Sequence, residues 1–173
     1  MKSIQSTVFM IVLSMAICGC SMFSARFQSS DPFYRSTGGN DFLRIPLIQP
    51  YDAIRGDENH GWTIDLQVSP SKEATYYISI KGVEKIAIEK GVILVYTPYS
   101  EESAEGLGEK VFYWFVLMPG KNTEKGFSNE QDFLIFIRDN GVQDPKWLDP
   151  DVLFQQFDKT GCLDWIPDCK LAK

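Results

Sequence analysis

The chain has 173 residues, of which 44% are hydrophobic and 13% aromatic, and its formal net charge is −6. This length and composition suit one domain of ordinary size, with a core that forms by packing rather than around metals or many disulfides. The acidic balance, without a stripe of clustered Lys and Arg, argues against a nucleic-acid partner and against broad adsorption to an anionic bilayer.

The N-terminus has the pattern of an export signal. Lys2 supplies one positive charge, and residues 8–17 (VFMIVLSMAI) form an apolar stretch of signal-peptide length. A membrane-spanning helix needs about 20 residues, so this stretch is too short to span a bilayer. An ordinary secretory signal or a buried apolar helix is the alternative interpretation.

Residues 17–20 (Ile-Cys-Gly-Cys) resemble the lipobox of bacterial lipoproteins. The resemblance implies cleavage between the small Gly19 and Cys20, a diacylglyceryl thioether on the Cys20 thiol, and a mature protein held to a membrane by this lipid. Cys18 stands where the family usually has Ser, Ala or another small residue. Cys18 is also the alternative anchor, but only Cys20 has an aliphatic residue, Ile17, three positions before it.

The residue after the acylated cysteine bears on location. In lipoproteins of Gram-negative bacteria an Asp at this position tends to retain the protein in the inner membrane, and this chain has Ser21. The resemblance therefore implies an outer-membrane lipoprotein facing the periplasm, with surface display left open. We expect a signal peptide over residues 1–19, a lipidated cysteine and tether over 20–40, and a single domain over 41–173.

Two further cysteines, Cys162 and Cys169, lie near the C-terminus. Cysteines close in sequence in an exported chain usually pair, so we predict a disulfide that closes a C-terminal loop. A metal site is not expected, because the chain has one histidine and a C-x6-C pair alone is not zinc spacing.

The first half of the mature chain has the pattern of short strands. Residues 42–51 alternate weakly, and Pro46 and Pro50 make this segment an edge strand or an extended arm. Further strands are predicted over residues 62–68, 75–80, 83–88 and 92–96, with Trp62, Ile64, Leu66 and Val68 buried in the first of them. Glycine in Lys81-Gly82 and Lys90-Gly91 supplies the positive φ of a tight reversal, so these strands form an antiparallel meander.

The second half combines one buried strand with two helices. Residues 110–118 (KVFYWFVLM) are almost continuously apolar, which is typical of a central strand buried on both faces, and the acidic residues 99–109 before it read as an exposed loop. A capping box at 128–131 and the stop Asn140-Gly141 predict a helix between them, although residues 133–137 could instead form a strand. Asp149, Pro150 and Gly161 delimit a second helix.

The fold class that these elements predict is α+β. We expect an antiparallel sheet of about five to six strands in a meander, with the two C-terminal helices packed on one face.

No common catalytic or cofactor-binding motif occurs in the sequence, so we expect no cofactor and no catalytic residue. His60, the single histidine, could act as a general base, but a lone histidine among turn residues is usually solvent-exposed. The candidate interface is aromatic: Tyr77, Tyr96, Tyr99 and Tyr113 come from neighbouring strands, and alternation sends some such side chains to the face opposite the helices. Core packing is the alternative.

These observations favour a non-enzymatic envelope lipoprotein that binds another protein or helps to organise an envelope assembly. A more specific version is an immunity protein or inhibitor that neutralises a toxin or hydrolase in the periplasm, since acidity suits basic targets. A small enzyme acting on lipid or peptidoglycan is the alternative from another class, and a pocket holding His60 beside a carboxylate and a hydroxyl would favour it.

Overall fold

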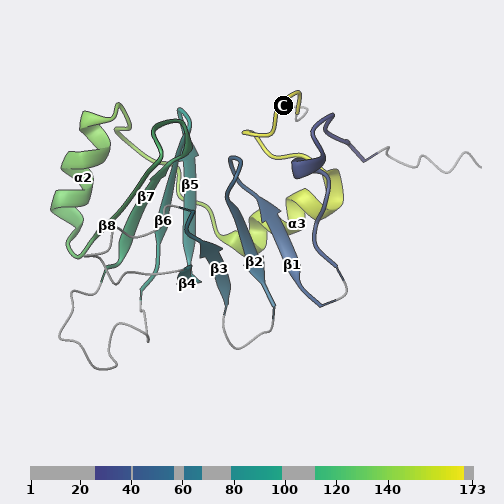
Figure 1. Cartoon of the computed structure of the whole chain (residues 1–173), viewed down its shortest axis with the longest axis horizontal. Coiled ribbons are helices and arrows are strands. Elements are labelled where there is room, and N and C mark those ends of the chain that lie inside the picture. Colours follow the sequence, from purple (N-terminus) through teal and green to yellow (C-terminus); the bar gives the residue numbers. More distant parts are fainter. Residues whose placement is uncertain (1–25, 40, 57–60, 68–78, 99–111, 170–173) are drawn as a thin grey trace, which may run out of the picture.

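Two four-stranded antiparallel sheets make up most of the domain (Figure 1). The computed structural model describes residues 26–39, 41–56, 61–67, 79–98 and 112–169. The first sheet contains β1 (Leu43–Pro46), β2 (Asp52–Arg55), β3 (Trp62–Asp65) and β4 (Ser79–Val83). The second contains β5 (Lys85–Glu89), β6 (Val92–Tyr96), β7 (Trp114–Met118) and β8 (Thr123–Phe127). Each sheet follows chain order, as expected of a meander.

Two helices follow the strands, α2 (Glu130–Asp139) and α3 (Pro150–Thr160). The α+β class with C-terminal helices is therefore confirmed. The strands differ from the prediction in number and grouping, because eight strands form two sheets, and each helix packs on a different sheet: α2 against β7 and β8, and α3 against β1.

The division into two sheets begins at Gly82. The sequence predicts a reversal at Lys81-Gly82, and this prediction is wrong: β4 continues through Gly82, whose φ is 64°, and the register with β3 shifts there. A positive φ serves a β-bulge as well as a turn, and a bulge bends the strand. After Glu84 the chain enters the second sheet. The reversal predicted at Lys90-Gly91 is confirmed, with φ of 51° and 78° and Glu89 paired to Val92.

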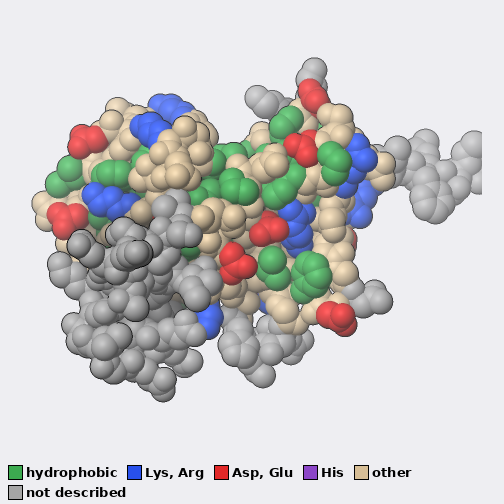
Figure 2. Space-filling view, in the orientation of Figure 1, with side chains coloured by type: hydrophobic (Ala, Val, Ile, Leu, Met, Phe, Trp, Pro, Cys, Tyr) green, Lys and Arg blue, Asp and Glu red, His purple; other side chains and the backbone are tan. Residues whose placement is uncertain are grey.

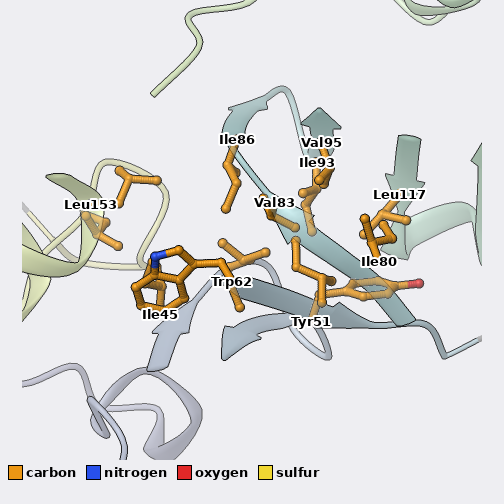
Figure 3. Close-up of a cluster of buried hydrophobic side chains, with 14 of the residues drawn as sticks. Ile45, Tyr51, Trp62, Ile80, Val83, Ile86, Ile93, Val95, Leu117 and Leu153 are labelled. Atoms are coloured by element: carbon orange, nitrogen blue, oxygen red, sulfur yellow. The ribbon is translucent and has the colours of Figure 1, made fainter. Parts of the chain in front are cut away.

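One buried cluster joins the two sheets (Figure 3). Ile45, Ile64 and Ile80 of the first sheet share it with Ile93, Val95, Phe115 and Leu117 of the second. Trp62 and Ile64 are buried as predicted and Leu66 is half-buried, while Val68 lies outside the described residues. The face of the second sheet opposite α2 is thus covered by the first sheet.

Strand β7 is buried on both faces, as predicted. Phe115 and Leu117 belong to the cluster between the sheets, whereas Val116 and Met118 belong to a second cluster with Phe133 and other residues of α2. The strand lies between β6 and β8. Because successive side chains of β7 point to opposite faces of the sheet, this one strand contributes to both buried clusters.

The helix ends match the sequence signals closely. Residues 133–137 are helical, so the alternative of a strand is excluded, and the cap of α2 is Asn129, whose side-chain oxygen accepts from the Asp132 N–H at 2.8 Å. The capping-box pattern had placed this cap one residue earlier. Asp149 and Pro150 begin α3, and Gly161, at a φ of 69°, ends it.

The segment over residues 26–39 is part of the fold, although the sequence assigns it to the tether. Ser29 and Tyr34 are buried, and residues Pro32–Tyr34 form a short 3-10 helix, η1. The Phe27 N–H donates to the Thr160 carbonyl at 2.8 Å, and the Arg26 guanidinium donates to the Phe157 carbonyl at 3.4 Å. The bond from Phe27 supplies a partner to the Thr160 carbonyl at the end of α3, while the Phe157 carbonyl accepts from the Gly161 N–H as well as from Arg26.

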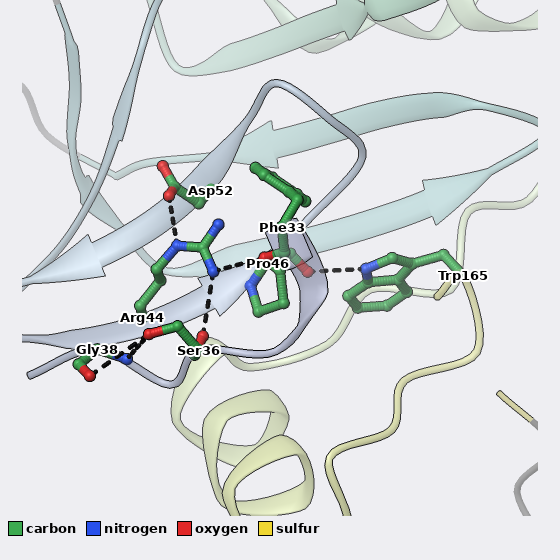
Figure 4. Close-up of polar contacts among 7 residues, drawn as sticks. All are labelled: Phe33, Ser36, Gly38, Arg44, Pro46, Asp52 and Trp165. Atoms are coloured by element: carbon green, nitrogen blue, oxygen red, sulfur yellow. Dashed lines mark hydrogen bonds and ion pairs between the residues drawn. The ribbon is translucent and has the colours of Figure 1, made fainter. Parts of the chain in front are cut away.

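Arg44 fastens this segment to the first sheet (Figure 4). Its guanidinium pairs with Asp52 at 2.6 Å and donates to the carbonyls of Phe33 and Ser36 at 2.8 and 3.1 Å. On the other side of η1, the Trp165 indole N–H donates to the Pro46 carbonyl at 3.0 Å. The N-terminal segment and the C-terminal loop therefore both pack on β1.

A buried tyrosine links the two sheets. The Tyr51 hydroxyl donates to a carboxylate oxygen of Glu124 in β8 at 2.8 Å, and the Gln67 N–H donates to the same oxygen. Burial, together with the neighbouring Glu124 carboxylate, raises the pKa of Tyr51 above its ordinary value.

Gly161→Ala tests whether the N-terminal segment is docked on α3. A Cβ at Gly161 would collide with the Phe27 carbonyl oxygen, whereas one at Gly91, which also has a positive φ, would meet no atom within 4 Å. We expect Gly91→Ala to cost about 1–2 kcal/mol from left-handed strain alone, and Gly161→Ala to cost at least about 3 kcal/mol. Urea unfolding measures both, and equal losses would contradict the docking.

Tyr51→Phe tests the pH dependence of the link between the sheets. Because the folded-state pKa lies above the unfolded value of about 10, the contribution of Tyr51 is complete below that pH and is lost as the pH rises above it. The variant should be about 1 kcal/mol less stable at pH 8 but should decline less steeply above about pH 10. Parallel curves of unfolding free energy against pH would contradict this expectation.

Candidate functional site

Several residues singled out in the sequence lie outside the described residues. These are Gly19 and Cys20 of the predicted cleavage site, His60, and the candidate interface residues Tyr77 and Tyr99. The acidic loop over 99–109 and most of the strand predicted over 75–80 also lie outside them.

The other two interface tyrosines lie on the α2 side of the second sheet or beside it. Tyr96 belongs to a cross-strand row that runs from Lys85 through Tyr96 and Trp114 to Phe127. Tyr113 precedes β7 and packs edge-on against Trp114, with ring centroids 5.7 Å apart. The face of the second sheet opposite α2 is covered by the first sheet, so the open face on which the candidate interface depended is not found there. Tyr77 and Tyr99 lie outside the described residues, and an interface at these tyrosines stays a prediction.

The row of aromatics continues onto α2. Trp114 stacks on Phe133 with ring centroids 6.3 Å apart, and Phe127 packs against Phe133 and Phe136 at 5.9 and 5.2 Å. Tyr96 and Trp114 are half-buried, so this group serves as packing and also approaches the surface. The alternative of core packing thus describes this aromatic group, and its role as an interface stays a prediction.

Cys162 and Cys169 are paired in a disulfide, with Cα atoms 5.6 Å apart. The loop that they close carries Leu163 and Ile166 into the cluster between the sheets. The disulfide therefore holds core residues in place and is not part of a surface site.

Three of the four sheet edges are contacted by other segments. Gly38 bridges to Leu43 at the free side of β1, and Leu148 exchanges two hydrogen bonds of 2.9 Å with Ile86 at the free side of β5. At β4 the Lys81 carbonyl accepts from the Thr97 hydroxyl at 3.0 Å. Among the described residues, no segment bridges to the outer edge of β8.

An open groove of about 410 Å³ runs between this edge and α2. Ser128 and Asn129 alone separate the strand from the helix, so the local chain reversal sets the two walls of the groove. The groove is lined by Phe112, Lys125, Gly126, Phe127 and Ser128 on the strand side and by Asp132, Ile135, Phe136 and Asp139 on α2.

The α2 wall is a single helical stripe. Asp132, Ile135, Phe136 and Asp139 have the spacing i, i+3, i+4 and i+7, so they lie on one side of the helix. Ile135 is 50% exposed, whereas Phe133 and Ile137, on the core side, are buried. The helix therefore has an apolar stripe toward the core and a mixed stripe toward the groove.

Lys125 and Gly126 shape the strand wall. The Lys125 ammonium lies 4.3 Å from the ring centroid of Phe136 and 5.0 Å from that of Phe127, within the range of a cation–π contact. At Gly126 a Cβ would collide with the Phe112 ring, so this ring packs directly on the backbone of β8. The groove thus has an aromatic floor with one cation, and two carboxylates on its α2 wall.

The polar side chains among the described lining residues of the groove are one lysine, two aspartates and one serine. The described lining residues include one hydroxyl, Ser128, and neither histidine nor cysteine. Within the described ranges there is no group of His, Cys, Asp and Glu that could hold a metal ion. No helix that the structure describes is both long and apolar enough to cross a bilayer.

Comparison of the chain with protein-family models, curated proteins and solved structures finds no match. The groove is accordingly interpreted from its own residues.

The sequence did not reveal β8 or the groove. The strand reads TEKGF, which has no apolar alternation, so the usual strand signal is missing. The available signal was on the helix, where Ile135 and Phe136 stand between two aspartates at helical spacing and outside the core-facing pair.

Proposed function

We propose that this protein is a lipid-anchored bacterial envelope lipoprotein that binds an extended segment of another protein along β8, without catalysing a reaction. The observation that carries the binding proposal is the outer edge of β8, which lies beside a groove and to which no other described segment pairs as a strand. The anchor is proposed from the resemblance of residues 17–20 to a lipobox.

Main-chain hydrogen bonds are the basis of the proposed recognition. The outer edge of a sheet carries backbone N–H and C=O groups that can pair with an added strand, and side-chain pockets beside the edge then supply selectivity. Here Phe127, Phe136 and Ile135 would receive apolar side chains of the incoming segment. Asp132 and Asp139 would favour a basic residue at its margin, as in acidic binding surfaces for basic partners.

The charged residues of β8 fit this role. Glu124 and Lys125 place two charged side chains in the short edge strand β8. Charges on an edge strand hinder the self-association of identical edges. A partner that supplies complementary groups is not excluded in the same way. The edge is therefore suited to a specific segment rather than to another copy of itself.

Cys20→Ser tests the anchor. We expect the wild-type protein to fractionate with membranes and its N-terminal peptide to carry the mass of a diacylglyceryl group on Cys20, because two or three acyl chains give near-permanent attachment. The variant should lose both the lipid mass and the membrane association, whereas Cys18→Ser should retain both. Unmodified Cys20 in membrane-associated wild-type protein would contradict the proposal.

A photo-crosslinking residue at Ile135 tests the groove. Val152 on α3 is the matched control, because it is also an aliphatic helix residue and is 56% exposed, against 50% for Ile135. We expect one protein to be captured in cells through one short segment at position 135 and not at 152. Lys125→Glu should abolish the adduct at 135, and Lys146→Glu, away from the groove, should not.

Equal adducts at positions 135 and 152 would contradict binding in the groove. Adducts at 135 that survive Lys125→Glu would contradict it as well. Circular dichroism and urea unfolding of each variant show whether a loss of capture reflects a loss of folding.

A further inference from the structure

The chain between the proposed lipid and the folded domain is short. Five residues separate Cys20 from Arg26, the first described residue. Six Cα–Cα steps reach at most about 20 Å, whatever their conformation. A domain of this chain length is roughly 40 Å across, so the tether is much shorter than the domain that it holds.

The domain end of the tether is fixed in place. Backbone and guanidinium groups of Arg26 and Phe27 bond to carbonyls of the last turn of α3, and the Arg26 guanidinium lies 5.9 Å from the Phe157 ring centroid. No additional tether length is available without breaking these contacts. The surface around Arg26 must therefore remain close to whatever carries the lipid.

This surface is less acidic than the rest of the protein. We call it the proximal surface; it comprises residues 26–35 and 158–159. It carries Arg26, Arg35 and Lys159 against Asp31 and Asp158, a net charge of 3 − 2 = +1, whereas the whole chain has −6. Arg35 is held at the surface by donating to the carbonyls of Ser29 and Ser30. Figure 2 shows Lys and Arg side chains beside the point where the N-terminal chain leaves the domain.

The groove lies at the other end of the molecule. Figure 1 shows α2 and β8 at one end of the long axis, and η1 with the end of α3 at the opposite end. A domain attached through the proximal surface would therefore direct the groove away from the attachment point.

We propose that the proximal surface rests on the phospholipid headgroups of the leaflet that holds the anchor, so that the domain stands on the bilayer and the β8–α2 groove faces the aqueous compartment. This inference rests on the proposed lipidation of Cys20. Arg26, Arg35 and Lys159 contact the headgroup phosphates, and the aspartates of the groove, at the far end, stay away from them.

The test uses photo-crosslinking residues in the full-length protein in cells, at Gln28 in the proximal surface and at Ile135 in the groove. Both positions are exposed. We expect phospholipid adducts, identified by mass spectrometry, at position 28 and not at 135. An 18-residue Gly/Ser insertion after Ser24 lengthens the tether fourfold and should lower the yield at 28 about eightfold, because effective concentration falls as the −3/2 power of linker length.

A second part of the experiment reverses one charge on the proximal surface. Lys159→Glu should lower the lipid adducts at position 28, whereas Lys121→Glu, which changes charge by the same amount in η3 (Pro119–Lys121), should leave them unchanged. Unfolding curves of both variants show whether the fold is intact.

The outcomes separate this inference from the proposed function. If mass spectrometry shows Cys20 lipidated but lipid adducts form equally at 28 and 135, or at neither position, the orientation is overturned and the anchor stands. If Cys20 carries no lipid, the anchor itself fails. Adducts at 28 that are insensitive to the Gly/Ser insertion would also overturn the orientation, because they would not depend on tether length.

Discussion

Strand β7 buries side chains on both of its faces, and this burial determines how the remaining elements are arranged. Phe115 and Leu117 need cover on one side, and Val116 and Met118 need it on the other. Each such side chain contributes about 1.5–3 kcal/mol when it leaves water. The first sheet covers one face and α2 the other, so the second sheet is the middle layer. The bulge at Gly82 allows one chain to build both sheets.

The same arrangement explains why the groove forms where it does. Helix α2 must cover Val116 and Met118, and because Ser128 and Asn129 alone join it to β8, it lies along the edge of the sheet. The outer edge of β8 and the outward stripe of α2 consequently face one groove. Glu124 also bonds to Tyr51, which directly precedes β2, so the strand that borders the groove is held both by β7 and by the first half of the domain. A rigid edge is suited to adding a strand, since it loses little conformational freedom on binding.

The helices and the buried strand could be predicted because their signals are local. Asp149, Pro150 and Gly161 act within a few residues, and the apolar run through β7 needs no knowledge of its neighbours. Gly82 could not be assigned in this way, because a positive φ serves a bulge or a turn equally and the pairing of β3 decides between them. Strand β8 was missed because it is stabilised by β7 rather than by its own composition. The segment over 26–39 has the composition of a linker, and only its contacts with α3 and with Arg44 of β1 make it part of the fold.

The bond between Phe27 and Thr160 joins the N-terminal segment to the end of α3, and these two residues are separated by more than 130 positions in the chain. Contacts of such sequence separation form late, because a long loop must close before they are gained. A chain exported with its N-terminus first would therefore complete its fold only after α3 has crossed the membrane. Until then, residues 26–39 would remain an undocked linker rather than part of the domain. The reach of the proposed lipid anchor would thus depend on folding: it would be long in the nascent protein and short once Phe27 has bonded to the end of α3.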